Sequence, residues 1–259
     1  MPHPVTWLAD AVARDGSRPA VTWYDDATGE RVELSGATLL TWVAKTAHFL
    51  SADLGVGPGS AVSVDLPRHW TAALWWLAVD AVGGARESSD HDDLDVAVIG
   101  PQRLDDLPAA QEVVAVSMAP MGAPFDATLP DLVHDFAVAV RGQPDHFGFA
   151  AAPESDAGRR DAQAAVELAQ AWGLGPKDRI LAVGPWAAPD PAVPELFTAL
   201  SADASVVWVR NPKHPGSVEH VESERVTAVL NTRTGQPVAS GIRVLTSPSV
   251  SFGRPSPPS

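Results

Sequence analysis

The sequence contains no cysteine among its 259 residues. This absence excludes a disulfide-stapled scaffold, a thiolate zinc site and a cysteine nucleophile, and it fits a reducing compartment. The first four residues, Met1–Pro4, have neither the basic start nor the apolar segment of a secretory signal peptide. The longest apolar stretch, Trp70–Val82, is about 13 residues long, whereas a membrane span needs roughly 20. We therefore expect a cytoplasmic protein with no membrane partner.

Basic residues are scarce, because 18 Lys and Arg stand against 32 Asp and Glu, for a formal net charge of -14. Nucleic acids are held by basic side chains that neutralise phosphates, so this balance argues against a nucleic-acid partner. Solubility is the simpler role of the acidity. The eight histidines show no metal-ligand spacing. Neither a Gly-x-Ser-x-Gly elbow nor a Gly-x-x-x-x-Gly-Lys loop occurs. The sequence therefore predicts no metal site and no catalytic residue.

What the sequence does contain is a helix–turn–strand unit that occurs twice. The first copy has a helix from a Ser35 cap to about Leu50, a turn at 55–59 and a strand at Ala61–Leu66. Within the turn, Pro and Gly at 58 and 59 suit the central positions of a type II turn. The second copy consists of the helix Arg160–Trp172, the turn Gly173–Asp178 and the strand Ile180–Val183. Two such units predict an α/β fold of mostly parallel sheets flanked by helices.

Further elements are expected around the two copies. The strands are Val96–Ile99, Val113–Ser117, Phe147–Ala151, Ser205–Val209, Val226–Leu230 and Ile242–Leu245, and the helices are His69–Val82, Leu129–Val140, Pro194–Leu200 and Ser217–Arg225. The acidic run Asp90–Asp95 is interpreted as a solvated loop. Helix 69–82 is apolar nearly all round and carries Trp70, Trp75 and Trp76. This pattern predicts either burial or a partner surface.

The order of these elements resembles the N-terminal domain of adenylate-forming enzymes, which include acyl-CoA synthetases, luciferases and nonribosomal-peptide adenylation domains. The segments that carry the resemblance are Arg18–Thr22, Glu33–Ser35, Leu54–Val62, Leu66-Pro67, Leu174–Val183 and Glu222–Val229. The sequence most resembles a short subgroup of that family from high-GC bacteria. The resemblance implies one domain over residues 1–245, like the N-terminal subdomains of acyl-CoA synthetases, and allows a subdivision near 142–150. Residues 246–259 form a Ser/Pro tail that is expected to be disordered.

Members of that family hold the ATP phosphates in a Ser/Thr/Gly-rich loop between a strand and a helix, closed by Gly-x-Pro-Lys-Gly. In this sequence the corresponding loop lies at 152–161. Its degenerate residues are Pro153, Glu154, Ser155, Asp156, Gly158, Arg159 and Arg160. Pro153 removes an N–H donor, and Glu154 and Asp156 bring negative charge to the place of a polyanion. Asp161 stands where the family has lysine. A like charge at about 4 Å costs on the order of 1 kcal/mol in water and several kcal/mol at a half-buried site.

Two alternatives remain for the basic residues of this loop. A shift of the loop by one or two residues would let Arg159 and Arg160 compensate for part of the lost charge. In the simpler interpretation, Ser155 or Asp156 caps the following helix and the arginines are solvated.

A second candidate site follows the strand Ile180–Val183, because ligands in open α/β sheets bind at the C-terminal ends of strands. The segment there coincides with the family's aromatic acyl-site loop. The candidate pocket residues are Trp186, Pro189 and Asp190. Core packing beneath a proline-rich loop is the simpler role of such an indole.

The resemblance also places further active-site elements beyond the point where this sequence ends. These are the adenine contacts, a Tyr-Gly-x-Thr-Glu-type magnesium motif, the ribose-binding Asp and a C-terminal domain with the catalytic lysine. We therefore expect a truncated, non-catalytic member that binds a small acyl or nucleotide ligand or a protein, and that uses no cofactor. One alternative is an acyl- or aminoacyl-adenylating ligase completed by a partner chain, which would use ATP, Mg²⁺ and CoA. Another is a structural subunit with helix 69–82 as its interface.

Overall fold

The computed structural model describes residues 3–149, 155–184, 195–213, 219–230 and 242–245. Two sheets organise these residues. One contains β1 (Pro19–Asp25), β2 (Glu30–Ser35), β8 (Arg179–Val183), β9 (Ser205–Arg210), β10 (Ala228–Leu230) and β11 (Arg243–Leu245). The other contains β3 (Ala61–Asp65), β4 (Ala85–Glu87), β5 (Leu94–Ile99), β6 (Ala110–Ala115) and β7 (Val133–Asp135). The helices are α1 (Pro4–Asp15), α2 (Gly36–His48), α3 (Trp70–Ala81), α4 (Phe136–Ala139), α5 (Asp156–Ala171), α6 (Glu195–Ser201) and α7 (Glu219–Ser223).

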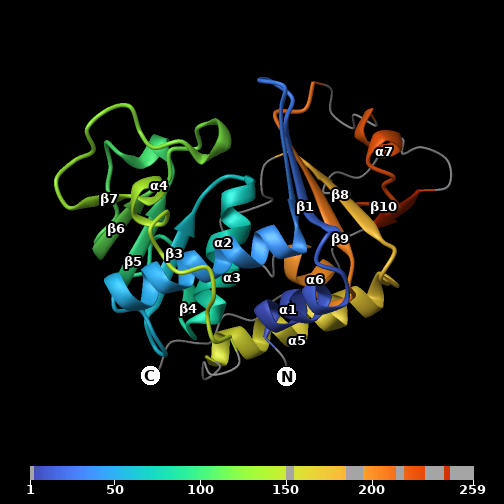
Figure 1. Ribbon diagram of the computed structural model, residues 1–259, viewed down its shortest axis with the longest axis horizontal. Coiled ribbons are helices and arrows are strands. Elements are labelled where there is room, and N and C mark those ends of the chain that lie inside the picture. The colour runs from blue at the N-terminus through green and yellow to red at the C-terminus, as the bar shows by residue number, and fades with distance from the viewer. Residues whose placement is uncertain (1–2, 150–154, 185–194, 214–218, 231–241, 246–259) are drawn as a thin grey trace.

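The six-stranded sheet has the order β11-β10-β8-β9-β1-β2, and the five-stranded sheet has the order β4-β3-β5-β6-β7. Only β1 and β2 pair in an antiparallel manner among the described strands. The two sheets stand to the right and left of the view, with α2 and α3 between them (Figure 1). The expected α/β fold of mostly parallel sheets flanked by helices is therefore confirmed.

Both predicted helix–turn–strand units are present. Ser35 caps α2, because its Oγ accepts a hydrogen bond from the Thr38 N–H at 3.1 Å. The turn after this helix has Gly59 at a φ of 92°, the left-handed conformation that a type II turn requires. The second unit is α5 followed by β8. The two copies deliver their strands to different sheets, β3 to the five-stranded sheet and β8 to the six-stranded sheet.

Helix α3 is buried on all sides because it packs between the two sheets. Trp75 meets Phe136 near the five-stranded sheet with ring centroids 4.8 Å apart, and Trp76 meets Trp208 of β9 at 6.0 Å. Every residue of the helix is buried. An apolar surface all round a helix is what such a position demands. The alternative in which this helix is an interface with another protein is therefore wrong, since no face of it remains exposed.

Three local expectations are wrong. The predicted helix 129–140 is instead β7 followed by the short α4. Leu132 adopts a left-handed φ of 67° and breaks the helical path, and the Asp135 carboxylate then caps α4 by accepting from the Ala137 N–H at 2.9 Å. Phe147–Phe149, the described part of the predicted strand 147–151, is not in a strand, and Phe147 packs on His48 of α2. Asp95, predicted to be in a loop, lies in β5 and accepts from the Ala61 N–H.

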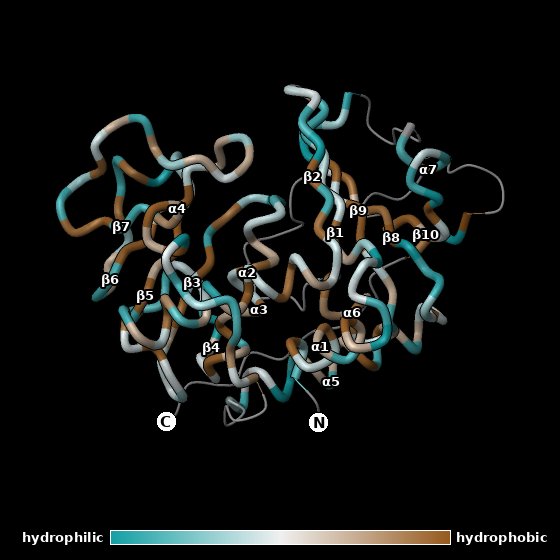
Figure 2. The backbone as a smooth tube through the Cα atoms, in the orientation of Figure 1, coloured by the Kyte–Doolittle hydropathy of each residue, from teal (hydrophilic) through white to brown (hydrophobic). Residues whose placement is uncertain are grey.

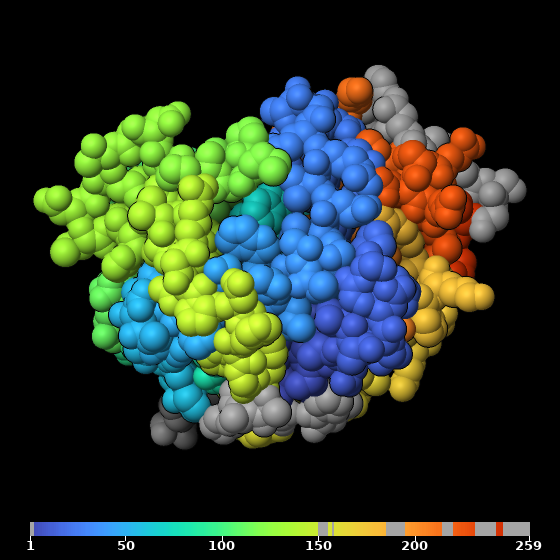
Figure 3. Space-filling view, viewed as in Figure 1, coloured from blue at the N-terminus to red at the C-terminus, as the bar shows by residue number. Residues whose placement is uncertain are grey.

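The N-terminal strands join the C-terminal part of the chain. Strand β1 pairs with β9 in parallel, with Val21 opposite Val206. The two regions, blue and orange, therefore lie against each other on the molecular surface (Figure 3). The central strands of both sheets are the most hydrophobic part of the trace (Figure 2). Over the described residues, no helix has the length and apolar character needed to cross a membrane. The predicted tail 246–259 lies outside the described residues.

Candidate functional site

Helix α5 begins within the sequence segment that corresponds to a phosphate loop. The Ser155 Oγ accepts a hydrogen bond from the Gly158 N–H at 2.9 Å and so caps the helix. Asp156 is exposed and pairs with Arg159 on the same turn, and Arg160 is exposed. This arrangement agrees with the simpler of the two alternatives given above, in which a residue of the loop caps the helix, and the cap is Ser155. Pro153 and Glu154 lie outside the described residues.

Asp161, at the family's lysine position, forms an ion pair with Arg86 of β4, and the two side chains are only 20% and 10% exposed. The Arg86 guanidinium also lies over the ring of Phe197 in α6, 4.6 Å from its centroid. Asp161 is thus neutralised within the protein and anchors α5 to β4 and α6. The charge of Asp161 is therefore expected to repel a phosphate group less strongly than an unpaired carboxylate at this position would.

A further carboxylate, that of Asp80 in α3, lies close to the start of α5. Its Oδ1 is 3.6 Å from the position that a Cβ on Gly158 would occupy. Asp80 is buried, and it also caps α1 by accepting from the Val5 N–H at 3.1 Å and from His3 Nδ1 at 3.4 Å. Negative charge is favoured at helix N-termini. The start of α5 thus lies beside a buried carboxylate of the protein itself.

The candidate pocket residues Trp186, Pro189 and Asp190 lie outside the described residues, but both ends of their segment are described. One buried side chain, that of Arg68, holds both ends. Its Nη1 donates to the Gly184 carbonyl at the end of β8, and its Nη2 contacts Glu195 Oε1 at the start of α6, each at 2.7 Å. The Arg68 and Glu195 side chains are 3% and 9% exposed. This buried ion pair fixes where the segment 185–194 leaves and re-enters the fold.

His69 follows Arg68 and lies at the C-terminal end of the six-stranded sheet. Its ring meets Trp23 of β1 edge to face, with centroids 4.4 Å apart. Burial, and then the nearby Arg210 guanidinium, lower the pKa of His69 to about 3, so the ring is neutral near pH 7. Its Nδ1 accepts from the Thr71 N–H at 3.3 Å, which leaves the proton on Nε2. That buried Nε2–H donor has no acceptor among the described residues.

Arg210 is the last residue of β9, and its side chain is half-buried. No hydrogen bond or ion pair of its guanidinium is present within the described part of the chain. Together, Arg210 and His69 present a cation and a neutral N–H donor at the C-terminal edge of parallel strands, where α/β sheets bind ligands. We define these two residues, with Arg68, as the strand-edge site. Its residue types suit an acceptor oxygen or a carboxylate.

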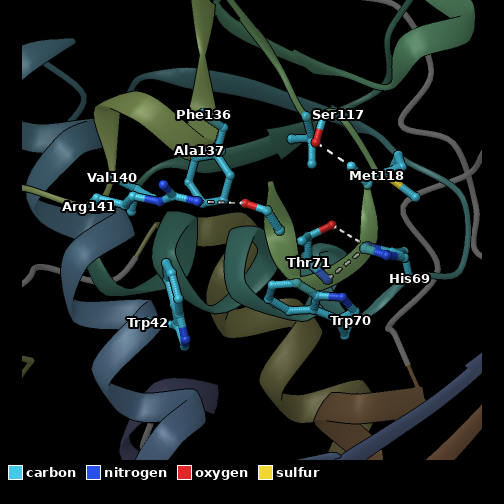
Figure 4. A pocket seen from close by; sticks show the side chains of 13 residues that line it. Trp42, His69, Trp70, Thr71, Ser117, Met118, Phe136, Ala137, Val140 and Arg141 are labelled. Carbon is cyan, nitrogen blue, oxygen red and sulfur yellow. Dashed lines mark hydrogen bonds between the residues drawn. The ribbon is translucent and has the colours of Figure 1, made fainter. Parts of the chain in front are cut away.

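His69 also lines a small enclosed cavity, shown in Figure 4. Trp42, Trp70, Phe136 and Arg141 line it, and its volume is about 20 Å³, enough for about one water molecule. The cavity therefore does not accommodate an acyl or nucleotide group. Within the described ranges, no group of three His, Asp or Glu side chains is placed to hold a metal ion.

Sequence reasoning missed the strand-edge site entirely. Arg68 and Glu195 are 127 residues apart in the sequence, and no motif links them. The one available signal was local. Arg68 and His69 are polar residues between Pro67 and an almost entirely apolar helix, which is a place where a charge must find a buried partner.

No protein-family model matches the chain. Solved structures similar to it include an acetoacetyl-CoA synthetase from Streptomyces lividans, with a TM-score of 0.63 and 18% identity over 88% of this chain and 42% of that one. An acyl-CoA synthetase from Brucella canis has a TM-score of 0.67 and 16% identity, over 89% of this chain and 47% of the other. A protein from Rhodopseudomonas palustris described as a long-chain-fatty-acid CoA ligase has a TM-score of 0.65 and 18% identity, with 90% and 63% covered.

These similarities show the fold, which resembles subdomains of acyl-CoA synthetases, and the chain spans 42% to 63% of the lengths of these three proteins. A nearer relative is a Mycobacterium tuberculosis protein described as a TIGR03089 family protein. It is 38% identical over 232 residues, which cover 82% of this chain and 91% of the relative. With that identity over nearly the whole relative, the chain belongs to the TIGR03089 family.

Proposed function

We propose that the chain is a non-catalytic binding module built on the acyl-CoA synthetase fold. It holds a small ligand that bears a carboxylate or acyl oxygen at the strand-edge site, and it does not use ATP. The observation that carries the proposal is the start of α5, which the protein fills with its own groups. The fold around that helix supports a comparison with adenylate-forming ligases.

The electrostatics at the start of α5 oppose a bound triphosphate. Ser155 already satisfies the Gly158 N–H, and the Asp80 carboxylate lies alongside. Of the cations described near it, Arg86 is engaged by Asp161 and Arg159 by Asp156. Each like-charge contact at about 4 Å costs several kcal/mol at a half-buried site. A polyanion would therefore meet a buried carboxylate and, among the described residues at the start of α5, one cation without an ion pair, the exposed Arg160.

The strand-edge site supports the ligand class. Arg210 and the His69 Nε2–H have unused donors within the described residues, and a buried donor without a partner costs about 1–3 kcal/mol. A ligand oxygen that satisfies both donors recovers that free energy. Arg68, next to His69 in the sequence, ties the end of β8 to the start of α6.

A thermal-shift screen of acyl-adenylate analogues, AMP, CoA and small carboxylates tests the ligand class. A ligand at 100 times its dissociation constant adds about 2.7 kcal/mol of stability, which is roughly 5–10 °C for a domain of this size. The shift is expected to be lost in Arg210→Gln and kept in Lys213→Gln. The control removes the same charge from an exposed lysine three residues away. A shift that survives Arg210→Gln places the ligand elsewhere and contradicts the assignment.

The non-catalytic part of the proposal is tested separately, by exchange of pyrophosphate into ATP. A ligase completed by a partner chain is the alternative that this assay detects, if cell extract is added to the purified chain. Exchange that requires the chain and extract together would favour this alternative and contradict the proposal. The ligand screen does not depend on that outcome, because it measures binding to the chain alone.

A further inference from the structure

A second charged site lies at the opposite end of the six-stranded sheet, away from the strand-edge site. It is an open bowl of about 390 Å³ at the N-terminal ends of β1, β8 and β9, within the size range of small-molecule sites. Five cations line it, namely Arg18, Arg31, Lys177, Arg179 and Arg225, along with the carboxylates Glu33, Asp178 and Glu224. We call it the cationic bowl. An excess of positive charge is notable in a protein of net charge -14.

The carboxylates of the bowl are already paired within the protein, and Glu33 and Glu224 pair with the bowl's own Arg31 and Arg179. Glu224 accepts from Tyr24 and Arg179 and pairs with Arg31 at 3.0 Å. Burial disfavours its charged form, yet the hydrogen bonds from Tyr24, Arg179 and Arg31 outweigh burial and hold the pKa of Glu224 below its usual value. These contacts neutralise the negative charge of Glu224. They also hold the side chains of Arg31 and Arg179 at the wall of the bowl.

Asp178 is occupied in the same way. It accepts from Thr227 at 2.7 Å and from the Gly175 N–H at 2.8 Å, and it pairs with Arg243. Burial raises its pKa, but these hydrogen bonds prevail and the pKa is lowered. The Thr227 hydroxyl also accepts from the Arg179 N–H at 3.0 Å. The segments at 177–179 and 225–227 therefore run next to each other, which brings Lys177 and Arg225 to the same bowl.

Lys177 and Arg225 are left as surplus cations. Both are exposed, and neither side chain has a hydrogen bond or ion pair within the described ranges. Arg225 also follows α7 in a left-handed conformation, with a φ of 51°. Glycine is the residue that adopts this conformation freely after a helix, whereas other residues incur about 1–2 kcal/mol. Arg225 thus adopts a backbone conformation that is unfavourable for a residue other than glycine.

We propose that the cationic bowl binds a small phosphate-bearing polyanion, with Lys177 and Arg225 as its principal contacts. Arginine donates paired N–H groups that match phosphate oxygens, and lysine adds a compact charge. The bowl is small and the rest of the surface is acidic, so it selects a small molecule over a nucleic acid. This site is separate from the strand-edge site, and neither proposal depends on the other.

Isothermal titration with inorganic pyrophosphate tests the proposal, with the full chain at a fixed ionic strength. The double variant Lys177→Gln/Arg225→Gln is expected to bind pyrophosphate about tenfold or more weakly, since it loses two exposed charge contacts. The matched control Lys213→Gln/Arg160→Gln removes the same charge from exposed positions outside the bowl, and it is expected to bind within twofold of the wild type.

Equal losses in the two double variants would mean that pyrophosphate senses only net charge, or lies at the start of α5 near Arg160, and either result overturns the proposal. Citrate that binds more tightly than pyrophosphate would overturn the assignment of phosphate chemistry. Melting curves of all variants accompany the titration. Because Lys177 and Arg225 make no described side-chain contact, the variants are expected to fold, and Arg225→Gly supplies a second variant that removes the cation while relieving the backbone.

Discussion

The substitution Glu195→Gln removes the charge that balances Arg68 in the interior. Arg68 is 3% exposed and Glu195 is 9% exposed, with 2.7 Å between Nη2 and Oε1. Breaking a buried ion pair by removing one partner typically destabilises a protein by about 3–5 kcal/mol, because an uncompensated charge remains. Arg68 keeps its hydrogen bond to the Gly184 carbonyl at 2.7 Å. We therefore expect a loss at the lower end of that range, about 3 kcal/mol.

The matched control is Asp145→Asn, which breaks the ion pair to Lys45. This pair has the same separation of 2.7 Å, but Asp145 is 59% exposed. Exposed pairs contribute about 0–1 kcal/mol, so the control is expected to lose no more than that. Urea denaturation followed by tryptophan fluorescence measures both losses, and an unchanged slope with denaturant shows that the same two states are compared.

The double variant Arg68→Met/Glu195→Leu completes the test. Replacing both charges with apolar groups of similar volume is often neutral or stabilising, so it is expected to recover most of the stability lost in Glu195→Gln. Equal losses for Glu195→Gln and Asp145→Asn would refute the reasoning, since it attributes the larger loss to the burial of the Arg68–Glu195 pair.

Three further expectations follow from single side chains. Ser155→Ala removes the cap of α5 and should lower the free energy of unfolding by about 1 kcal/mol, measured by urea denaturation, and no change would show that the cap is not formed. Because the pKa of His69 is about 3 when folded and 6.5 when free, the unfolded chain binds the extra proton between those pH values. Stability should therefore fall as the pH drops through that window, by up to about 1.4 kcal/mol per pH unit, and the His69→Gln variant should lack this slope. If stability varies with pH in the same way in the wild type and in His69→Gln, the neutral, buried state of the His69 ring is contradicted. Arg225→Gly should raise the free energy of unfolding by about 1 kcal/mol while weakening pyrophosphate binding, and a loss of stability would show that its conformation is not strained.

Local patterns in the sequence predicted the features that depend little on contacts with distant parts of the chain. The cap at Ser35 and the left-handed Gly59 follow from side-chain and backbone chemistry within four residues. The burial of helix 70–81 follows from its apolar surface, which only a position between two layers can hide. Such features depend on residues that are close in the sequence and not on distant parts of the chain.

The elements that failed depend on distant partners. The segment 129–140 has apolar spacing that suits a helix, yet Val133 pairs with Val113 of β6 in the structure. Strand pairing over this distance carries no signature in one sequence. The same holds for β1, which joins a sheet made mostly of residues after 178.

The candidate sites show the same division. The lost charge pattern of the phosphate loop was visible in the sequence, but the groups that fill its place were not. Asp80 and Arg86 come from other elements, at least 70 residues before the start of α5. The strand-edge site and the cationic bowl likewise combine residues from elements and connections that meet only in the folded protein.

Exchange of labelled pyrophosphate into ATP by the purified chain, with Mg²⁺ and a panel of carboxylic acids, tests most directly whether the start of α5 holds ATP. Because Ser155 caps α5 and the Asp80 carboxylate lies alongside, the proposal expects no exchange above the protein-free blank with any acid. Exchange that scales with the concentration of the chain, and that persists when Lys177 and Arg225 are replaced, would contradict the non-catalytic account.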